Sequence, residues 1–253
     1  LQTLLEINNE VTEQEKAYYR IFNEMILPEL RNNGIILYQT EKVEPFHRTY
    51  VENYFNEEVF PYLQPMIILK DDIHSFIQDG CIYLVVSLQK KKKKKTPGSS
   101  SYTYAMMKIP NTNVPRFVEL PSFGGNHYLI FIDDLIKANL QSVFPGYEII
   151  DCYSIKISRD ADFSLDKEDQ KNIAERILRK VRKRKIGAVT RFQYDKEMPD
   201  YFLKYLCEAY EIEEEELLPS GRYLNLSDLI KLPNPVGEQL RQPLPHPLRV
   251  PEL

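Results

Sequence analysis

The spacing of apolar residues changes at about residue 65, and this change constrains the fold more than any other feature of the 253-residue chain. Before it, apolar side chains recur at intervals of three and four residues, which is the period of an amphipathic helix. After it, they alternate with a period of two, as in strands. The sequence therefore predicts an α+β chain. A helical pair in residues 1–64 is followed by a mixed β-sheet domain, covered by helices, in residues 65–232.

The first helix is expected over residues 13–33 and the second over residues 50–59. The first places most of its apolar side chains on one face and stops at Asn33-Gly34, a typical helix end. The second stops before Pro61. A short extended piece, residues 35–38, joins them. Two such helices cannot bury both apolar faces by themselves, so we expect a partner surface to cover them.

The rest of the sheet domain follows from the same patterns. Strands are expected over residues 81–88 and 102–109, which form a hairpin, and over residues 116–120, 128–132, 147–157 and 188–194. Helices are expected over residues 133–144 and 165–185 and from Pro199 onward.

The two ends of the chain predict that it is an internal piece of a larger cytosolic enzyme. It opens at Leu1 inside helix-like sequence, and residues 233–253 carry six prolines, which suit a linker to a missing C-terminal catalytic region. The longest apolar runs are too short to cross a bilayer, and no secretion signal opens the chain. Cys81, Cys152 and Cys207 lie far apart, which favours free thiols over disulfides or a zinc site.

Lys90 to Lys95 form the strongest charge feature, at the tip of the predicted hairpin. Such a run can attract a polyanion by displacing its counterions. It can equally be a solvated loop that keeps the protein soluble, and we favour this second interpretation. A basic cluster in residues 176–185 is interpreted in the same way, as a solvated helix end. The formal net charge of −4 argues against a dedicated nucleic-acid binder.

Four segments, taken in order, resemble the bacterial polyphosphate kinase family. They are Val-Pro-Arg-Phe-Val-Glu-Leu-Pro at residues 114–121, preceded by Lys-Ile-Pro at 108–110; Ser-Ile-Lys-Ile-Ser-Arg-Asp-Ala-Asp at 154–162; Arg-Phe-Gln-Tyr at 191–194, before Met198-Pro199; and Pro-Ser-Gly-Arg-Tyr at 219–223. Their order and spacing are similar to that family's middle, or head, domain. The opening helices resemble the end of its N-terminal helical domain.

The resemblance implies a parent enzyme that transfers the γ-phosphate of ATP to polyphosphate through a phosphohistidine, with magnesium, in the cytoplasm or at the inner membrane face. In the family, the phosphorylated histidine follows this domain. We therefore assign no catalytic residue here, and we expect the chain alone to be inactive and to hold neither ATP nor magnesium. His47, His74, His127 and His246 stand alone in the sequence, which fits this assignment. The implied partners are a second copy in a dimer, the C-terminal catalytic domains and polyphosphate, with no nucleic acid.

Within these segments, Lys156, Arg159, Arg191 and Arg222 are the candidates for contact with phosphate. Arg159 ends a strong strand, and Gly221 beside Arg222 lets the backbone approach a ligand closely. The alternative, which we favour for Arg159 and Arg222, is that they pair with local carboxylates and fix loop shape. Asp160 and Asp162 are too few to form a metal site, so none is assigned.

Two other functional classes stay open at this point. The chain could be a stand-alone interaction module that uses its helical pair to bind a partner. It could also be a polyanion-binding domain that works through the lysine loop, in which case its binding would weaken steeply with salt.

Overall fold

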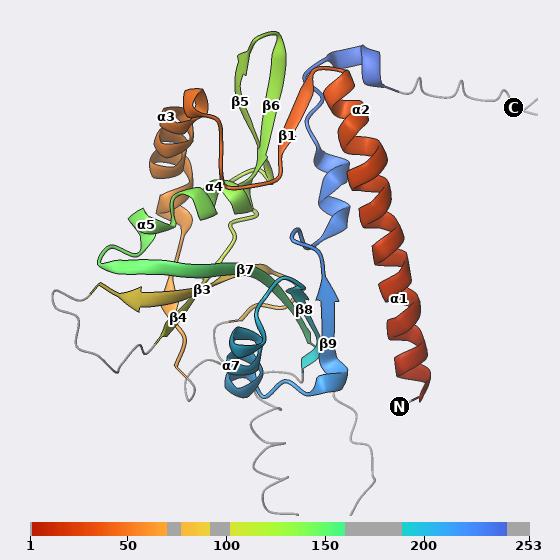
Figure 1. The fold of residues 1–253 in the computed structure, drawn as a ribbon, viewed down its shortest axis with the longest axis vertical. Helices are drawn as coiled ribbons and strands as arrows, with labels where there is room; N and C mark the ends of the chain where they lie inside the picture. Colours follow the sequence, from red (N-terminus) through yellow and green to blue (C-terminus); the bar gives the residue numbers. More distant parts are fainter. Residues whose placement is uncertain (1, 70–76, 92–101, 160–188, 242–253) are drawn as a thin grey trace, which may run out of the picture.

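The structure is a computed structural model that describes residues 2–69, 77–91, 102–159 and 189–241 (Figure 1). It confirms the predicted α+β class, with N-terminal helices followed by mixed β-sheets and a few further helices. The helix expected over residues 165–185 lies outside the described residues, as does most of the lysine run.

The N-terminal helices agree with the sequence pattern. The first consists of α1 (Gln2–Ile21), the π-helical η1 (Phe22–Ile26) and α2 (Leu27–Asn32), so it begins well before residue 13. It ends where predicted, because Gly34 has a φ of +73°, which glycine adopts easily. The second consists of α3 (Pro45–Tyr54), η2 (Phe55–Val59) and the short 3-10 turn η3 (Phe60–Tyr62).

The strands form two sheets. The larger has the order β2-β4-β3-β7-β8-β9, and the smaller the order β1-β6-β5. The larger contains β2 (Met66–Ile67), β3 (Ile82–Lys90), β4 (Thr103–Lys108), β7 (Tyr147–Arg159), β8 (Val189–Asp195) and β9 (Leu217–Ser220). The smaller contains β1 (Ile35–Tyr38), β5 (Phe117–Phe123) and β6 (Asn126–Phe131). β3 and β4 form the predicted antiparallel hairpin, whereas β1–β6 and β8–β9 are parallel pairs.

The extended piece between the two helical runs has a larger part in the fold than its length suggests. As β1 it pairs with β6, with Ile35 opposite His127 and Tyr38 opposite Ile130. The helical part is thus tied to the sheets by backbone hydrogen bonds as well as by the chain itself. The division of the chain at residues 64 and 65 stays a prediction.

The six-stranded sheet is buried on both faces at its centre. Along β3, Leu84, Val86 and Leu88 enter one hydrophobic cluster, whereas Tyr83 and Val85 enter another. The first cluster is covered by α3, α4 (Ile132–Ala138) and α5 (Leu140–Val143), and the second by α7 (Asp200–Tyr210). In Figure 1, α7 lies on the opposite side of β3 and β7 from α4 and α5.

The first face becomes polar where the sheet continues into β7, β8 and β9. Ile155, Ile157 and Phe192 belong to the second cluster, so their neighbours Lys156, Arg191 and Gln193 point to the opposite face. Helix α1 runs alongside β9 in Figure 1, next to this polar part of the sheet. The fold therefore places polar side chains between the sheet and the N-terminal helix.

Candidate functional site

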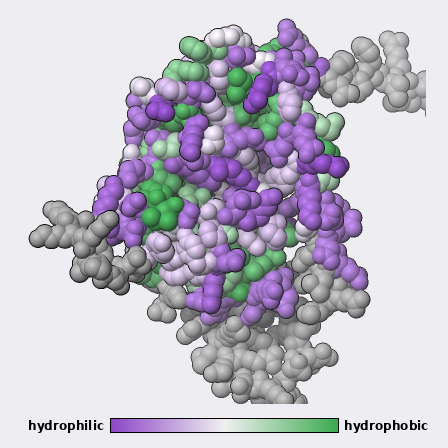
Figure 2. Space-filling view, in the orientation of Figure 1, coloured by the Kyte–Doolittle hydropathy of each residue, from purple (hydrophilic) through white to green (hydrophobic). Residues whose placement is uncertain are grey.

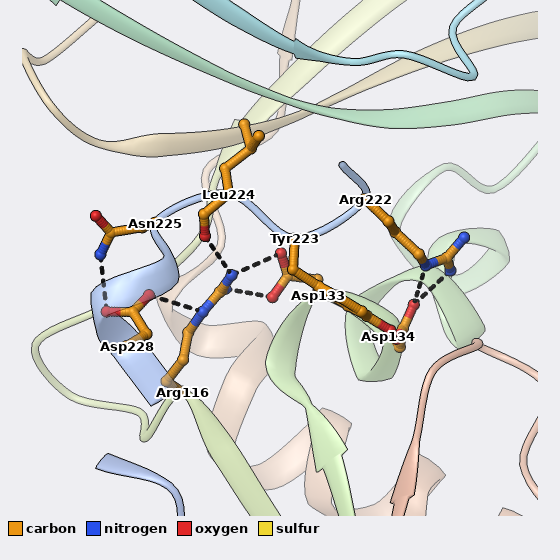
Figure 3. Close-up of polar contacts among 8 residues, drawn as sticks. All are labelled: Arg116, Asp133, Asp134, Arg222, Tyr223, Leu224, Asn225 and Asp228. Atoms are coloured by element: carbon orange, nitrogen blue, oxygen red, sulfur yellow. Dashed lines mark hydrogen bonds and ion pairs between the residues drawn. The ribbon is translucent and has the colours of Figure 1, made fainter. Parts of the chain in front are cut away.

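The chain that runs from the end of β9, residues 219–231, contacts α1, α4 and Arg116, which directly precedes β5. It contains the 3-10 helix η6 (Leu226–Lys231), which follows Asn225, a residue with a φ of +67°. Asparagine tolerates this left-handed conformation better than other non-glycine residues. Figure 3 shows how residues of this segment meet Arg116, which directly precedes β5, and the two aspartates of α4.

Arg222 is held by two carboxylates from different elements. Its Nε donates to Oδ1 of Asp134 at 3.2 Å, and an Nη donates to Oε2 of Glu41 at 2.6 Å. Asp134 lies in the first turn of α4 with a fully buried side chain, and it also accepts a hydrogen bond from the Tyr223 hydroxyl. A buried carboxylate requires such partners. Arg222 therefore links the segment to α4 and to the N-terminal part of the chain.

A second buried pair lies next to the first. Arg116, just before β5, contacts Asp133 with both terminal nitrogens, one of them at 3.1 Å. Its Nε lies 3.1 Å from Oδ2 of Asp228, and a terminal nitrogen donates to the Leu224 carbonyl at 3.4 Å. Arg116 and Asp133 are 10% and 1% exposed, respectively, so this charge is almost wholly enclosed by protein.

The environment shifts the pKa values of these groups in directions that follow from burial and charge. Burial raises the pKa of Asp134, and the Arg222 guanidinium opposes this only in part. Burial and then the Asp134 carboxylate raise the pKa of Tyr223 far above its usual range. The pKa of Arg222 is also raised, because Asp134 and Glu41 outweigh the opposite effect of burial. The tyrosine and the guanidinium thus keep their protons at all ordinary pH values.

The structure brings two of the four predicted cations together. Ser158 on β7 is the Cα partner of Arg191 on β8, and Lys156 precedes Ser158 by two residues. Lys156 and Arg191 therefore share one face of neighbouring strands, at diagonal positions. Lys156 donates to Oδ1 of Asn225 at 3.1 Å.

The other two predicted cations stand apart from this pair. The guanidinium of Arg222 points to Asp134 and Glu41, carboxylates that lie 88 and 181 positions away in the chain rather than in the local sequence. Arg159 ends β7, and its side chain lies outside the described part of the structure.

Helix α1 contacts the same segment through two tyrosines and one glutamate, and the hydroxyl of the first, Tyr18, donates to the Leu226 carbonyl at 3.3 Å. The hydroxyl of Tyr19 donates to the Tyr223 carbonyl at 2.8 Å. Glu15 accepts hydrogen bonds from Gln193 at 3.2 Å and from Ser220 at 2.9 Å. A Cβ on Gly221 would lie 2.5 Å from Cζ of Tyr19, so only glycine permits the observed approach of the Tyr19 ring to the backbone of the segment.

A cavity of about 840 Å³ opens beside the Arg116 network. Its lining includes the loop of residues 109–115, the start of β5 and three residues of the segment, Asn225, Asp228 and Lys231. Because Arg116 is already bound by two carboxylates, its charge is used to hold the segment in place. Lys231 lines the cavity and is exposed, and Lys156 contacts Asn225, which is also part of the lining.

The sequence alone did not indicate that Arg116, Asp133, Asp134 and Tyr223 form a connected group. A signal was present, because Asp133 and Asp134 interrupt an apolar stretch directly after a strand, and Arg116 lies within another. What the sequence does not contain is the pairing of these residues: Arg116 and Asp133 are 17 positions apart, and Asp134 and Tyr223 are 89 positions apart.

The described histidines have structural contacts. Nε2 of His47 lies 2.8 Å from the Pro121 carbonyl, so this nitrogen donates, and Nδ1 accepts from the Tyr38 hydroxyl at 3.0 Å. His127 contacts Ser122 at 3.2 Å. Within the described ranges, no cluster of three or more potential metal ligands occurs, and no helix is long and apolar enough to span a membrane.

Comparison with known proteins identifies the family. A model of the polyphosphate kinase middle domain matches residues 46–232, which is most of the chain. The chain therefore belongs to the polyphosphate kinase family, as its sequence motifs suggested.

Individual relatives agree with this identification. The polyphosphate kinase of Vibrio cholerae is 31% identical over 89% of the chain, and that of Escherichia coli K12 is 28% identical over 94%. The crystal structure of polyphosphate kinase from Porphyromonas gingivalis superposes with a TM-score of 0.80 and 40% identity over 98% of the chain. The chain spans about a third of the length of these relatives, 32%, 35% and 35% respectively.

Proposed function

We propose that this chain is the middle region of an enzyme that transfers the γ-phosphate of ATP to polyphosphate through a phosphohistidine, with magnesium. The support for the reaction is the family and the names of the relatives, each about three times as long as the chain. In this proposal the middle region has an architectural role. It holds the connecting segment, residues 219–231, in one position relative to α1 and the sheets, and it offers cations to the phosphate chain.

The observation that carries the proposal is the pair Lys156 and Arg191 on one face of β7 and β8. The carbonyl oxygen of Asn225, which is neutral, accepts from the Lys156 ammonium, so that contact leaves its positive charge uncompensated. Two cations at diagonal positions on a rigid sheet suit a linear polyanion, which presents a row of negatively charged oxygens. Arg222 is assigned to the architecture, because its guanidinium is occupied by Asp134 and Glu41.

The second part of the proposal is contact with another copy through the N-terminal helices. Ile7, Ile21 and Met25 of this region are 53%, 45% and 65% exposed, and they recur on one side of the helix. Figure 2 shows hydrophobic surface as separate patches within a mainly hydrophilic face. An exposed apolar stripe on a long helix is typical of a surface that is covered in the assembled protein.

The first experiment measures transfer of labelled γ-phosphate from ATP, with magnesium and a short polyphosphate primer. It compares the chain alone with the chain mixed with the C-terminal half of a family member. We expect no label from the chain alone and recovered synthesis in the mixture. Labelling of the chain alone would refute the absence of a nucleophile in it.

The second experiment measures binding of fluorescent polyphosphate to Lys156→Met and Arg191→Met variants. Loss of one phosphate contact is expected to weaken binding by about tenfold. Lys108→Met is the matched control, because Lys108 is the Cα partner of Tyr83 and thus lies on the opposite face of the same sheet. If all three variants bind polyphosphate equally weakly, the loss of affinity reflects the loss of one positive charge alone. Lys156 and Arg191 would then have no specific contact with the phosphate chain.

A further inference from the structure

The side chain of Asn225 links the proposed phosphate site to the buried Arg116 network. Its Oδ1 accepts a hydrogen bond from the Lys156 ammonium at 3.1 Å. Its Nδ2 donates to Oδ1 of Asp228 at 2.8 Å (Figure 3). Oδ2 of the same carboxylate lies 3.1 Å from Nε of Arg116, whose guanidinium also binds Asp133. One amide therefore connects a cation on the sheet with a guanidinium that is almost wholly enclosed by protein.

The two partners of this amide fix its orientation. A carboxylate accepts hydrogen bonds, whereas an ammonium group can only donate them. The Asn225 amide must therefore turn its NH2 group to Asp228 and its oxygen to Lys156, because the opposite orientation would place two donors, and two acceptors, face to face. Since Arg116 holds the Asp228 carboxylate, the oxygen that Lys156 contacts is held in one position.

The backbone of Asn225 has a conformation that glycine adopts at lower cost. Its φ and ψ are +67° and 65°, in the left-handed region. Glu211, the other non-glycine residue with positive φ in the described part of the chain, is the residue at which α7 ends. Asn225 instead precedes η6, and its carbonyl accepts from the backbone N–H of Asp228 at 3.0 Å. The two contacts of its amide give a physical reason for asparagine at this position.

The neutral partner distinguishes Lys156 from the arginines of the same region. Arg116 and Arg222 are each bound by two carboxylates, which compensate their charges. An amide oxygen holds the Lys156 ammonium in place without cancelling its charge. A lysine that is already held loses less side-chain freedom when a phosphate oxygen binds to it, so the contact is stronger than one made by a free lysine.

We infer that Asn225 is the positioning residue for Lys156 in binding of the phosphate chain. The inference rests on the proposed function, in which Lys156 contacts phosphate. Asn225 acts through the ammonium group, which it holds on the face that Lys156 shares with Arg191. The contact with Asp228 makes the position of this cation depend on the connecting segment.

The test is a double-mutant cycle of Asn225→Gly and Lys156→Met, read out by binding of fluorescent polyphosphate. Glycine keeps the left-handed backbone and removes only the amide. We expect Asn225→Gly to weaken binding by about three- to tenfold, because the phosphate must then immobilise the freed lysine. In the Lys156→Met background it should have no further effect.

The outcomes separate this inference from the proposed phosphate site. Equal weakening by Asn225→Gly in both backgrounds would show an effect on the fold rather than on Lys156, and would overturn the inference. Weaker binding in Lys156→Met but not in Asn225→Gly would overturn it and leave the phosphate site intact. Unchanged binding in Lys156→Met would refute the phosphate site and the inference together.

Asn234→Gly is the matched control, because Asn234 lies nearby in the chain and its amide bonds the Gly237 carbonyl at 2.7 Å and the Val236 N–H at 3.3 Å. Binding should be unchanged in this variant. A second measurement, 15N relaxation of the lysine ammonium groups, needs no polyphosphate. The Lys156 ammonium should be more ordered than that of the exposed Lys231 and should lose this order in Asn225→Gly. Equal mobility of the Lys156 ammonium in both proteins would overturn the inference whatever the binding results.

Discussion

Replacement of Gly221 by alanine adds one methyl group where the connecting segment meets α1. Gly221 is absent from the residues with positive φ, so an alanine can adopt its backbone conformation. The obstacle is Tyr19, because the new Cβ would lie 2.5, 2.6 and 2.9 Å from its Cζ, Cε1 and Oη. The ring cannot move freely, since its hydroxyl is bound to the Tyr223 carbonyl at 2.8 Å. The variant must therefore displace Tyr19 and with it the contact of α1.

The size of the effect follows from two losses and one small gain. Overpacking in a fixed environment costs about 1–3 kcal/mol. Loss of the Tyr19 hydrogen bond adds about 1 kcal/mol. Alanine restricts the unfolded chain more than glycine does, which returns about 0.5 kcal/mol. We expect Gly221→Ala to reduce the free energy of unfolding by about 1.5–3.5 kcal/mol, measured by urea denaturation at 25 °C.

Gly221→Ala can also be made in two variants of Tyr19, which separate the steric overlap with the ring from the loss of the hydroxyl's hydrogen bond. In Tyr19→Phe the hydroxyl is absent but the ring remains, so Gly221→Ala should still cost about 0.5–2.5 kcal/mol. In Tyr19→Ala the ring is gone, and Gly221→Ala should cost less than about 0.5 kcal/mol, with a double-mutant coupling equal to the difference. If Gly221→Ala lowers the free energy of unfolding as much in the Tyr19→Ala variant as in the unmodified chain, the contact of Tyr19 with Gly221 is not the cause of the destabilisation.

Three further predictions concern the buried charges. Arg116→Met should destabilise the fold by about 3–5 kcal/mol, because Asp133 would stay buried without its cation, and Arg116→Met combined with Asp133→Asn should recover part of this in urea denaturation. Arg222→Met should cost about 2–3 kcal/mol, somewhat less because Asp134 keeps the Tyr223 hydroxyl, and it should cost under about 1 kcal/mol in an Asp134→Asn background. Tyr223 keeps its proton in the fold but ionises near pH 10 when unfolded, so its contribution is complete below pH 10 and is lost above it. Denaturation at pH 10.5 and 11.5 should show a slope about 1.4 kcal/mol per pH unit shallower for Tyr223→Phe than for the unmodified chain, and equal slopes would contradict the raised pKa.

The fold was predictable from the sequence where apolar residues repeat with a clear period. Apolar side chains of β3, β4 and β7 are buried in the hydrophobic clusters. They recur with the period of two that is typical of strands, so the sequence shows these three strands clearly. β1 was expected only as an extended piece and β9 was not expected; each has four residues, and each pairs in parallel with a strand from which other elements separate it in the chain. Strands this short carry too few residues to show a period, and their partners are set by packing of the whole chain.

The candidate site shows the same limit for charged residues. Sequence alone indicated that Lys156, Arg191 and Arg222 lie in distinctive segments, but their environments differ. The register of β7 and β8 places Lys156 near Arg191, whereas Arg222 forms an ion pair with the buried carboxylate of Asp134. An arginine that binds a ligand and one that neutralises a buried carboxylate look alike in the sequence, because the chemistry of the guanidinium is the same in both. Only the partner distinguishes them, and here each partner of Arg222 is distant in the chain.

The hydrogen bonds of the connecting segment also show how it is held in place. Residues 219–231 are bound at Arg222 and Tyr223 by α4, at the Leu224 carbonyl by Arg116, and at the Tyr223 carbonyl by α1. These contacts come from different elements, so the segment cannot shift without breaking buried hydrogen bonds in more than one of them. If the middle region orients its neighbours in the parent enzyme, this segment is the element that transmits the orientation. Arg222→Met should then reduce phosphate transfer in the reconstituted mixture even at temperatures where the variant stays folded, whereas a purely stabilising role predicts full transfer there.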